Sequence, residues 1–121
     1  MTDGQKVSKA ADLKVLVVDD EPAILQAWKR ILADHDCEIR TLADGGEVLT
    51  AVEGFRPDVV LLDIRLPRVS GVDLLRDIKA RHNDTEVVMM TAYATVETAV
   101  DAVKLGAYDF LTKPFANIEA A

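Results

Sequence analysis

The chain has 121 residues, of which 50% are apolar and 29% are charged, a balance typical of one globular domain with its own core. Its formal charge of −7 excludes a general nucleic-acid-binding surface, because binding phosphates requires a basic face. No apolar run approaches the roughly 20 residues of a membrane helix, and no signal peptide is apparent, so we expect a cytoplasmic protein without membrane or direct nucleic-acid partners.

The chain begins with a polar stretch, which we expect to be a flexible tail over residues 1–12 preceding a single domain over residues 13–121. Short apolar runs then recur along the domain: Val15 to Val18, Cys37 to Leu42, Val59 to Leu62, Val87 to Met90, and Tyr108 to Leu111. Several of these runs are unbroken, which is typical of parallel strands covered on both faces.

Amphipathic segments separate the apolar runs. In the first segment, apolar residues such as Ile24 and Trp28 recur at helical spacing, and Pro22 suits a first helical turn. Three later segments have the same pattern: Val48 to Val52, Val72 to Ile78, and Val96 to Val103. Alternating strands and helices predict βαβ units, hence an α/β fold with a doubly wound, five-stranded parallel sheet.

The end of the sequence leaves little room for a fifth helix. Only residues 115–121 follow Lys113 and Pro114, and so short a segment forms at most two helical turns. We therefore expect a truncated fifth helix, or another element on that flank of the sheet. An apolar flank left exposed in this way would favour pairing of two copies.

Polar residues follow the apolar runs where ligands bind in open parallel sheets, at the carboxyl ends of the strands. These residues are Asp19, Asp20 and Glu21 after the first run, Asp63 after the third, Thr91 after the fourth, and Thr112 and Lys113 after the fifth. Each alone has an ordinary explanation, such as acids at a helix start or a solvated lysine. Their convergence on one edge instead favours a common site.

The charges of this edge indicate its chemistry. Asp19, Asp20 and Asp63 exceed the single positive charge of Lys113, and carboxylate oxygens are the ligands that Mg²⁺ prefers, with Mn²⁺ as a substitute. A cation, an amine and a hydroxyl around Asp63 would suit phosphoryl transfer. Carboxylate attack on phosphorus gives an acyl phosphate, which is a known covalent intermediate.

Four blocks of sequence resemble the receiver domains of two-component response regulators: VLVVDDEP, DVVLLDIRLPRVSG, VVMMTAY and GAYDFLTKPF. The resemblance runs from about Leu13 to Phe115 and implies a flavodoxin-like fold. It further implies that a histidine kinase or phosphotransfer protein supplies a phosphoryl group to Asp63. The domain would catalyse only its own phosphorylation and dephosphorylation, and would not otherwise be an enzyme.

The resemblance also implies the metal ligands and the groups around the phosphoryl group. Asp20 would bind Mg²⁺ directly, Asp19 would act mainly through water, and the backbone carbonyl of Arg65 would be a further ligand. Thr91 and Lys113 would hold the phosphoryl oxygens. Pro114 would follow a cis peptide bond.

A conformational switch is part of the same resemblance. Thr91 would shift toward the phosphoryl group and Phe110 would rotate inward, although simple core packing explains Phe110 equally well. The surface that changes would comprise residues 96–105 and 108–111. Arg65 and Tyr93 would flank the mouth of the site and obstruct attacking water, or else be ordinary exposed loop side chains. A Tyr93→Ala variant would then lose its phosphoryl group faster.

The stretch TAYATVETAVDAVKLGAYDFLTKPF most resembles receivers of ATPase-type transcription activators, so we expect an output domain outside this chain and a role in transcription regulation. A homodimer through the fourth helix and fifth strand region is a further expectation. Three alternatives stay open: a phosphate-independent interaction module, a phosphatase with an aspartate nucleophile, and a flavin-binding protein. His35 and His82 lie in polar stretches, and we assign neither a ligand nor a phosphoryl-carrier role.

Overall fold

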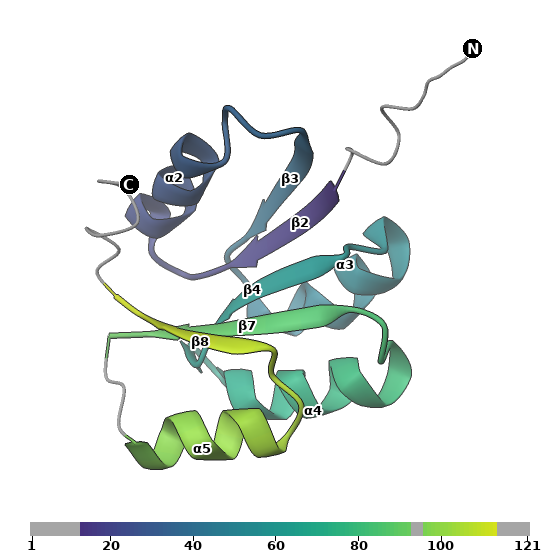
Figure 1. Cartoon of the computed structure of the whole chain (residues 1–121), viewed down its shortest axis with the longest axis vertical. Helices are drawn as coiled ribbons and strands as arrows, with labels where there is room; N and C mark the ends of the chain where they lie inside the picture. Colours follow the sequence, from purple (N-terminus) through teal and green to yellow (C-terminus); the bar gives the residue numbers. More distant parts are fainter. Residues whose placement is uncertain (1–12, 93–95, 114–121) are drawn as a thin grey trace.

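The structure is a computed structural model that describes residues 13–92 and 96–113 (Figure 1). Three predictions from the sequence lie outside the described residues. They concern the tail over residues 1–12, Tyr93 and Pro114. Among the helices that are described, none combines the length and the apolar character needed to cross a lipid bilayer.

Five strands form one parallel sheet in the order β3-β2-β4-β7-β8, which confirms the predicted doubly wound fold. Their bounds are Leu13–Val18 for β2, Cys37–Leu42 for β3, Val59–Asp63 for β4, Glu86–Thr91 for β7 and Asp109–Thr112 for β8. The chain passes from β2 to β3 on one side and returns to β4 on the other. The strand order therefore reverses between β2 and β4, where open α/β sheets bind ligands.

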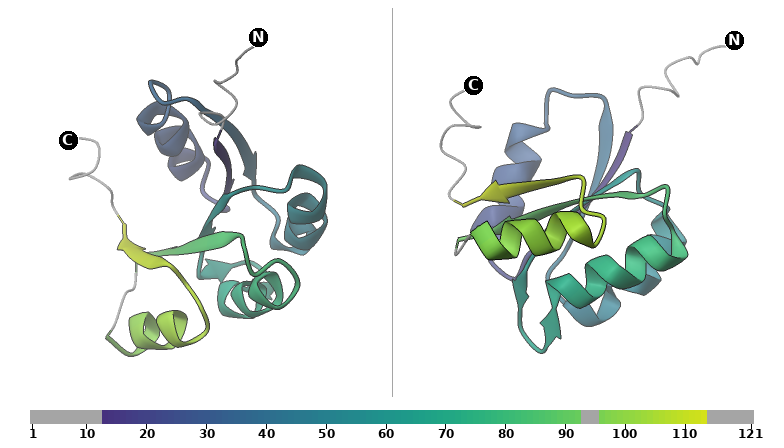
Figure 2. Two further views of the ribbon diagram at one scale, coloured as in Figure 1. Left: turned by 45° about the vertical axis from the view of Figure 1, so that its right-hand side comes forward. Right: turned by 60° about the horizontal axis from the view of Figure 1, so that its bottom comes forward.

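Helices cover both faces of this sheet, as Figure 2 shows. They are α2 (Pro22–Ile31), α3 (Val48–Phe55), α4 (Gly71–Arg81) and α5 (Val96–Lys104). Helix α2 packs on one face, and the other three pack on the opposite face. Pro22 occupies the first turn of α2, as predicted, because its missing N–H is not needed there.

The alternation of side chains along β2 explains its unbroken apolar run. Leu16 and Val18 join the core beneath α3, α4 and α5, whereas Val15 and Val17 pack with Trp28 of α2. All four β2 side chains are buried. A central parallel strand has no solvent-facing side, so neither set of alternate positions tolerates polar residues.

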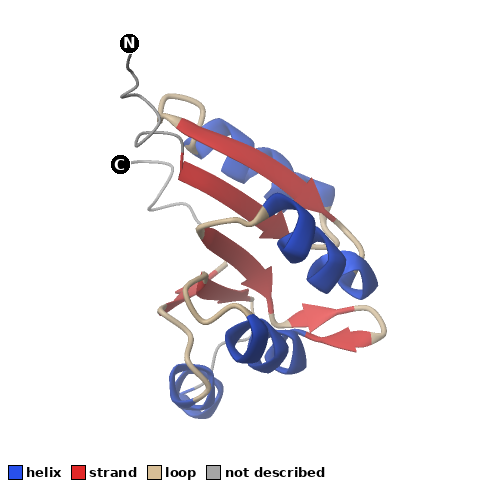
Figure 3. Cartoon of the chain, turned by 90° about the vertical axis from the view of Figure 1, so that its right-hand side faces the viewer, coloured by secondary structure: helices blue, strands red, loops and turns tan. Residues whose placement is uncertain are grey.

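The segment after β4 contains a small element that no apolar run of the sequence indicated. Pro67 and Arg68 form the turn of a small antiparallel ribbon, β5 (Arg65–Leu66) and β6 (Val69–Ser70) (Figure 3). Arg68 adopts a φ of 66°, a conformation that glycine or asparagine usually supplies in such turns. The two-residue strands are too short to produce a visible alternation of apolar and polar residues.

A short helical turn precedes α3. Residues Gly45–Glu47 form a single 3₁₀ turn, η1. The Gly46 amide donates a hydrogen bond of 2.8 Å to Asp44 Oδ1, which caps this turn.

Candidate functional site

The carboxyl ends of four neighbouring strands bring the predicted polar residues together. Asp19 follows β2, Asp63 ends β4, Thr91 ends β7 and Lys113 follows β8. All four are buried, although each is polar or charged. Strands β4, β7 and β8 each end one residue later than the apolar runs predicted. Asp63 and Thr91 therefore belong to the sheet itself and are held by it.

Lys113 is the centre of this cluster. Its Nζ lies 2.6 Å from Asp19 Oδ2, 3.0 Å from Glu21 Oε1 and 3.0 Å from Asp63 Oδ2. A single ammonium group therefore bridges three carboxylates that come from the ends of two strands. The sequence placed Glu21 at this edge but gave it no role of its own, because nothing local distinguishes it from an acid at a helix start.

Backbone amides hold the second oxygen of both buried carboxylates. The Glu21 amide donates to Asp19 Oδ1 at 2.9 Å, and the Arg65 amide donates to Asp63 Oδ1 at 3.0 Å. The Lys113 amide donates to the Thr91 carbonyl at 2.9 Å, which fixes the start of the loop after β8. These bonds orient the carboxylates before any ligand arrives.

Burial and charge shift the ionisation of two site residues. Burial alone disfavours the charged Lys113, but its bonds to Asp19, Glu21 and Asp63 outweigh that effect and raise the pKa of Lys113. Burial raises the pKa of the Asp19 carboxyl, because hydrogen bonds from Lys113 and the Glu21 amide only partly offset the loss of water. Three carboxyl groups thus share the one ammonium group of Lys113, so the cluster has more acidic groups than its own lysine can neutralise.

The acids at this edge fit a divalent cation. Oxygen atoms of Asp19, Asp20 and Asp63 lie within 4.8 Å of one another. Apart from its ion pair with Lys113, the buried Asp19 Oδ2 has no hydrogen-bond partner among the residues that the structure describes. An all-oxygen set with excess negative charge is what Mg²⁺ prefers, so these residues are suited to hold it.

An open pocket of about 340 Å³ lies over the cluster. It is lined by Asp20, Glu21, Asp63, Arg65, Thr91, Ala92 and Lys113. Asp63 faces this pocket although it is only 4% exposed, so a small solute reaches the carboxylate from one direction. Arg65 is exposed at the pocket, where the sequence placed it.

Phe110 in β8 is partly buried and packs against the core beneath α3, α4 and α5. This position suits ordinary packing, and it also leaves part of the ring accessible. The proposed inward rotation stays a prediction. Tyr93, the other expected flank of the site mouth, lies in the segment that the structure does not describe.

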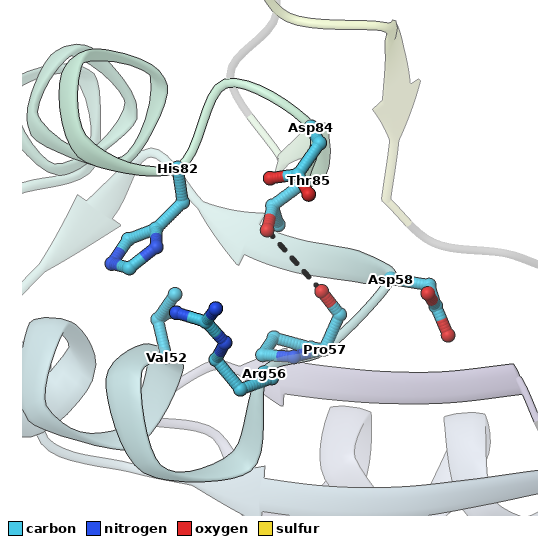
Figure 4. Close-up of a pocket in the computed structure, with 7 residues that line it drawn as sticks. All are labelled: Val52, Arg56, Pro57, Asp58, His82, Asp84 and Thr85. Atoms are coloured by element: carbon cyan, nitrogen blue, oxygen red, sulfur yellow. Dashed lines mark hydrogen bonds between the residues drawn. The ribbon is translucent and has the colours of Figure 1, made fainter.

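A second, smaller pocket of about 80 Å³ lies at the opposite, amino ends of β4 and β7 (Figure 4). It is lined by Val52, Arg56, Pro57, Asp58, His82, Asp84 and Thr85. The Thr85 hydroxyl donates to the Pro57 carbonyl at 3.2 Å and joins the two loops. The sheet thus separates His82 from Asp63, and we give this pocket no part in the chemistry.

A family model described as "Response regulator receiver domain" matches residues 15–120 of the chain. The chain is 43% identical over 106 residues to the DNA-binding transcriptional regulator NtrC of Salmonella typhimurium, covering 88% of this chain and 23% of NtrC. It is 45% identical over 103 residues to the response regulator protein PilR of Pseudomonas aeruginosa, again covering 23% of the relative and 84% of this chain. The chain therefore spans about a quarter of these curated relatives.

Solved structures show the same likeness. The receiver domain of NtrX from Brucella abortus is 41% identical, with a TM-score of 0.79 over 88% of this chain and 92% of that one. The receiver domain of a LuxO repressor protein from Vibrio parahaemolyticus is 31% identical, with a TM-score of 0.84 over 90% of this chain and 83% of that one. The beryllofluoride-activated NtrC4 receiver domain dimer is 34% identical, with a TM-score of 0.81 over 88% of this chain and 90% of that one.

Proposed function

Because the chain belongs to the response regulator receiver domain family, we propose that it accepts a phosphoryl group on Asp63 and changes conformation in response. The observation that supports this proposal is the position of Asp63. Its carboxylate is buried at the edge of the sheet, opens to a pocket and lies 3.0 Å from Lys113 Nζ. A surface aspartate in a turn would have neither the burial nor the bound lysine.

The proposed reaction is the attack of an Asp63 carboxylate oxygen on phosphorus. A bond forms between that oxygen and phosphorus, and the bond between phosphorus and the donor breaks, with the electron pair leaving on the donor. Lys113 and the Thr91 hydroxyl would hold the phosphoryl oxygens. Mg²⁺, held by Asp19, Asp20, Asp63 and the Arg65 carbonyl, or Mn²⁺ in its place, would neutralise the added negative charge.

The switch follows from the new charge. A phosphoryl group adds about −1.5 to −2 charge near pH 7 beside a buried threonine. Movement of Thr91 toward it would leave space that Phe110 can enter, since both residues lie in adjoining strands. The surface of α5 and β8 would then carry the signal.

The partners are proposed from the relatives. A histidine kinase or phosphotransfer protein would supply the phosphoryl group in the cytoplasm, and an output domain outside this chain would regulate transcription. The NtrC4 neighbour is a receiver dimer. We propose that this chain also pairs through α5 and β8, where Val100, Val103 and Tyr108 are 44%, 57% and 71% exposed.

The test is to incubate the chain with acetyl phosphate and Mg²⁺ and to measure its intact mass. We expect a gain of one phosphoryl group that EDTA prevents and that Asp63→Asn abolishes. Asp77→Asn, which changes an exposed aspartate on α4, is the matched control and should behave as the native chain does. No gain in a folded native chain, or a gain that persists in Asp63→Asn, would contradict the proposal and favour a phosphate-independent interaction module.

A further inference from the structure

The Lys113 ammonium group is fully occupied in this structure. A lysine ammonium has three N–H donors, and Nζ lies within 3.0 Å of three carboxylates, those of Asp19, Glu21 and Asp63. A phosphoryl oxygen that binds Lys113 must therefore take the place of one of these carboxylates.

The three carboxylates differ in what they would lose. Asp19 is fully buried, and its Oδ2 has no other hydrogen-bond partner among residues 13–92 and 96–113. Separating it from Lys113 would leave a buried charge without compensation, which is costly. Asp63 carries the phosphoryl group itself. The Glu21 side chain is 60% exposed, so water can replace Lys113 as its partner.

We propose that Glu21 is a positioning residue that occupies one N–H of Lys113 in the unphosphorylated state and leaves it when a phosphoryl group arrives. This inference rests on the proposed phosphorylation of Asp63. Glu21 would act as a competitor of the phosphoryl group for Lys113. It would thereby bias the switch toward the unphosphorylated state.

Within the part of the chain that the structure describes, this ion pair is the one bond of the Glu21 side chain, so a substitution there removes no other. It is the N-cap residue of α2, but its side chain makes no capping hydrogen bond. The bonds that it does contribute to the loop are made by its backbone: its amide donates to Asp19 Oδ1, and its carbonyl accepts from Ile24 and Leu25. Substitution of the side chain leaves these bonds in place.

The first experiment measures the affinity for beryllofluoride, a phosphoryl mimic, at saturating Mg²⁺. We expect Glu21→Gln and Glu21→Ala to bind it about two- to five-fold more tightly than the native chain, the range expected when an exposed ion pair is lost. Glu47→Gln is the control, because it removes one negative charge from an exposed position in η1, at the same end of the sheet. Equal affinities in native and Glu21 variants, or an equal gain in Glu47→Gln, would overturn the inference.

The second experiment observes Lys113 directly by ¹⁵N NMR of its ammonium group, assigned with Lys113→Arg. We expect Glu21→Gln to change the Lys113 signal in the Mg²⁺-bound state and to leave it unchanged in the beryllofluoride-bound state, because Glu21 has already left Lys113 there. The same change in both states would show that Glu21 stays bound and would overturn the inference.

The outcomes also separate the two proposals. A native chain that binds no beryllofluoride and gains no phosphoryl group overturns the proposed function and the role of Glu21 with it. A native chain that does both, with Glu21 variants that match it in affinity and in the Lys113 signal, overturns only the role of Glu21.

Discussion

At the scale of single residues, the site combines more buried negative charge than its own cation can neutralise. Asp19 and Asp63 are almost completely shielded from water, and Lys113 is the residue that compensates both. The pKa of Asp19 is raised by burial even so. The unliganded site is therefore electrostatically unfavourable, and this deficit is what a bound cation would relieve.

Replacing Lys113 should destabilise the fold. We expect Lys113→Met to lower the free energy of unfolding by about 3 kcal/mol in EDTA, because two buried carboxylates lose their counter-ion. Saturating Mg²⁺ should restore part of this loss, since a ligand that binds only the folded state stabilises it. Urea unfolding in EDTA and in Mg²⁺ measures both effects. Lys104→Met, at an exposed position on α5, should change stability by less than about 0.5 kcal/mol.

Removing the charge of Asp19 should have the opposite effect. Because burial raises the pKa of Asp19 in the folded state, ionisation of this residue opposes folding. We expect Asp19→Asn to raise the free energy of unfolding in EDTA at pH 7, because it removes the buried charge and keeps the shape of the side chain.

The pH dependence of this stability difference tests whether ionisation of Asp19 opposes folding. The advantage of Asp19→Asn should be largest above the raised pKa of Asp19 and should shrink as the pH falls. It should vanish only below the ordinary pKa of 3.8, where the Asp19 carboxyl is protonated in both the folded and unfolded states. Urea unfolding of both proteins at several pH values measures this difference. An advantage that grows on acidification would contradict the assignment.

At the scale of secondary structure, the start of α4 is held directly against the end of β4. The Gly71 amide donates to the Ile64 carbonyl at 2.9 Å, and Ser70 caps the helix through its side chain. A Cβ atom at Gly71 would lie 2.3 Å from the Asp63 carbonyl oxygen and 2.7 Å from Ile64 Cα. Only glycine permits this approach, so the helix start and the proposed phosphorylation site share one rigid contact.

Gly71→Ala should therefore disturb both the fold and the site. We expect it to lower the free energy of unfolding by about 1 to 3 kcal/mol, the cost of forcing extra volume into a packed region, and to slow the gain of a phosphoryl group from acetyl phosphate.

Gly54→Ala is the matched control, since a Cβ atom there meets nothing within 4 Å. Gly54 lies in α3, so this substitution should instead stabilise the protein by about 0.5 to 1 kcal/mol. Equal effects at the two glycines would contradict the close contact.

Considered as a whole, the protein has its helices distributed unevenly over the two faces of the sheet. Helix α2 packs on one face, whereas α3, α4 and α5 pack on the other. The exposed apolar side chains Val100, Val103 and Tyr108 belong to α5 and to the turn that leads into β8. This surface adjoins the strand that delivers Lys113, so a change at the site is close to it in the fold.

A charge on this surface should weaken pairing of the phosphorylated chain. We expect Val103→Lys to weaken association of the beryllofluoride-bound chain about tenfold, as for a central interface residue, without changing phosphorylation of Asp63. Sedimentation velocity over a range of concentrations measures the association. Leu13→Lys is the control, because Leu13 is likewise an exposed apolar residue, at 44% against 57% for Val103, but begins β2 at the amino ends of the strands. A native chain that stays monomeric in both states would contradict the pairing.

The parallel strands, the helices that flank them and the edge at which the site forms could all be predicted from the sequence. Strand and helix periodicities are local properties, and parallel strands necessarily present their carboxyl ends at one edge, so Asp63, Thr91 and Lys113 could be placed together. Which atoms meet at that edge is known only from the folded chain. Glu21 and Lys113 are 92 residues apart, and Gly71 contacts Asp63 through backbone, so no local pattern marks either contact. Such contacts depend on packing distances, which are fixed only when the whole sheet and its helices assemble.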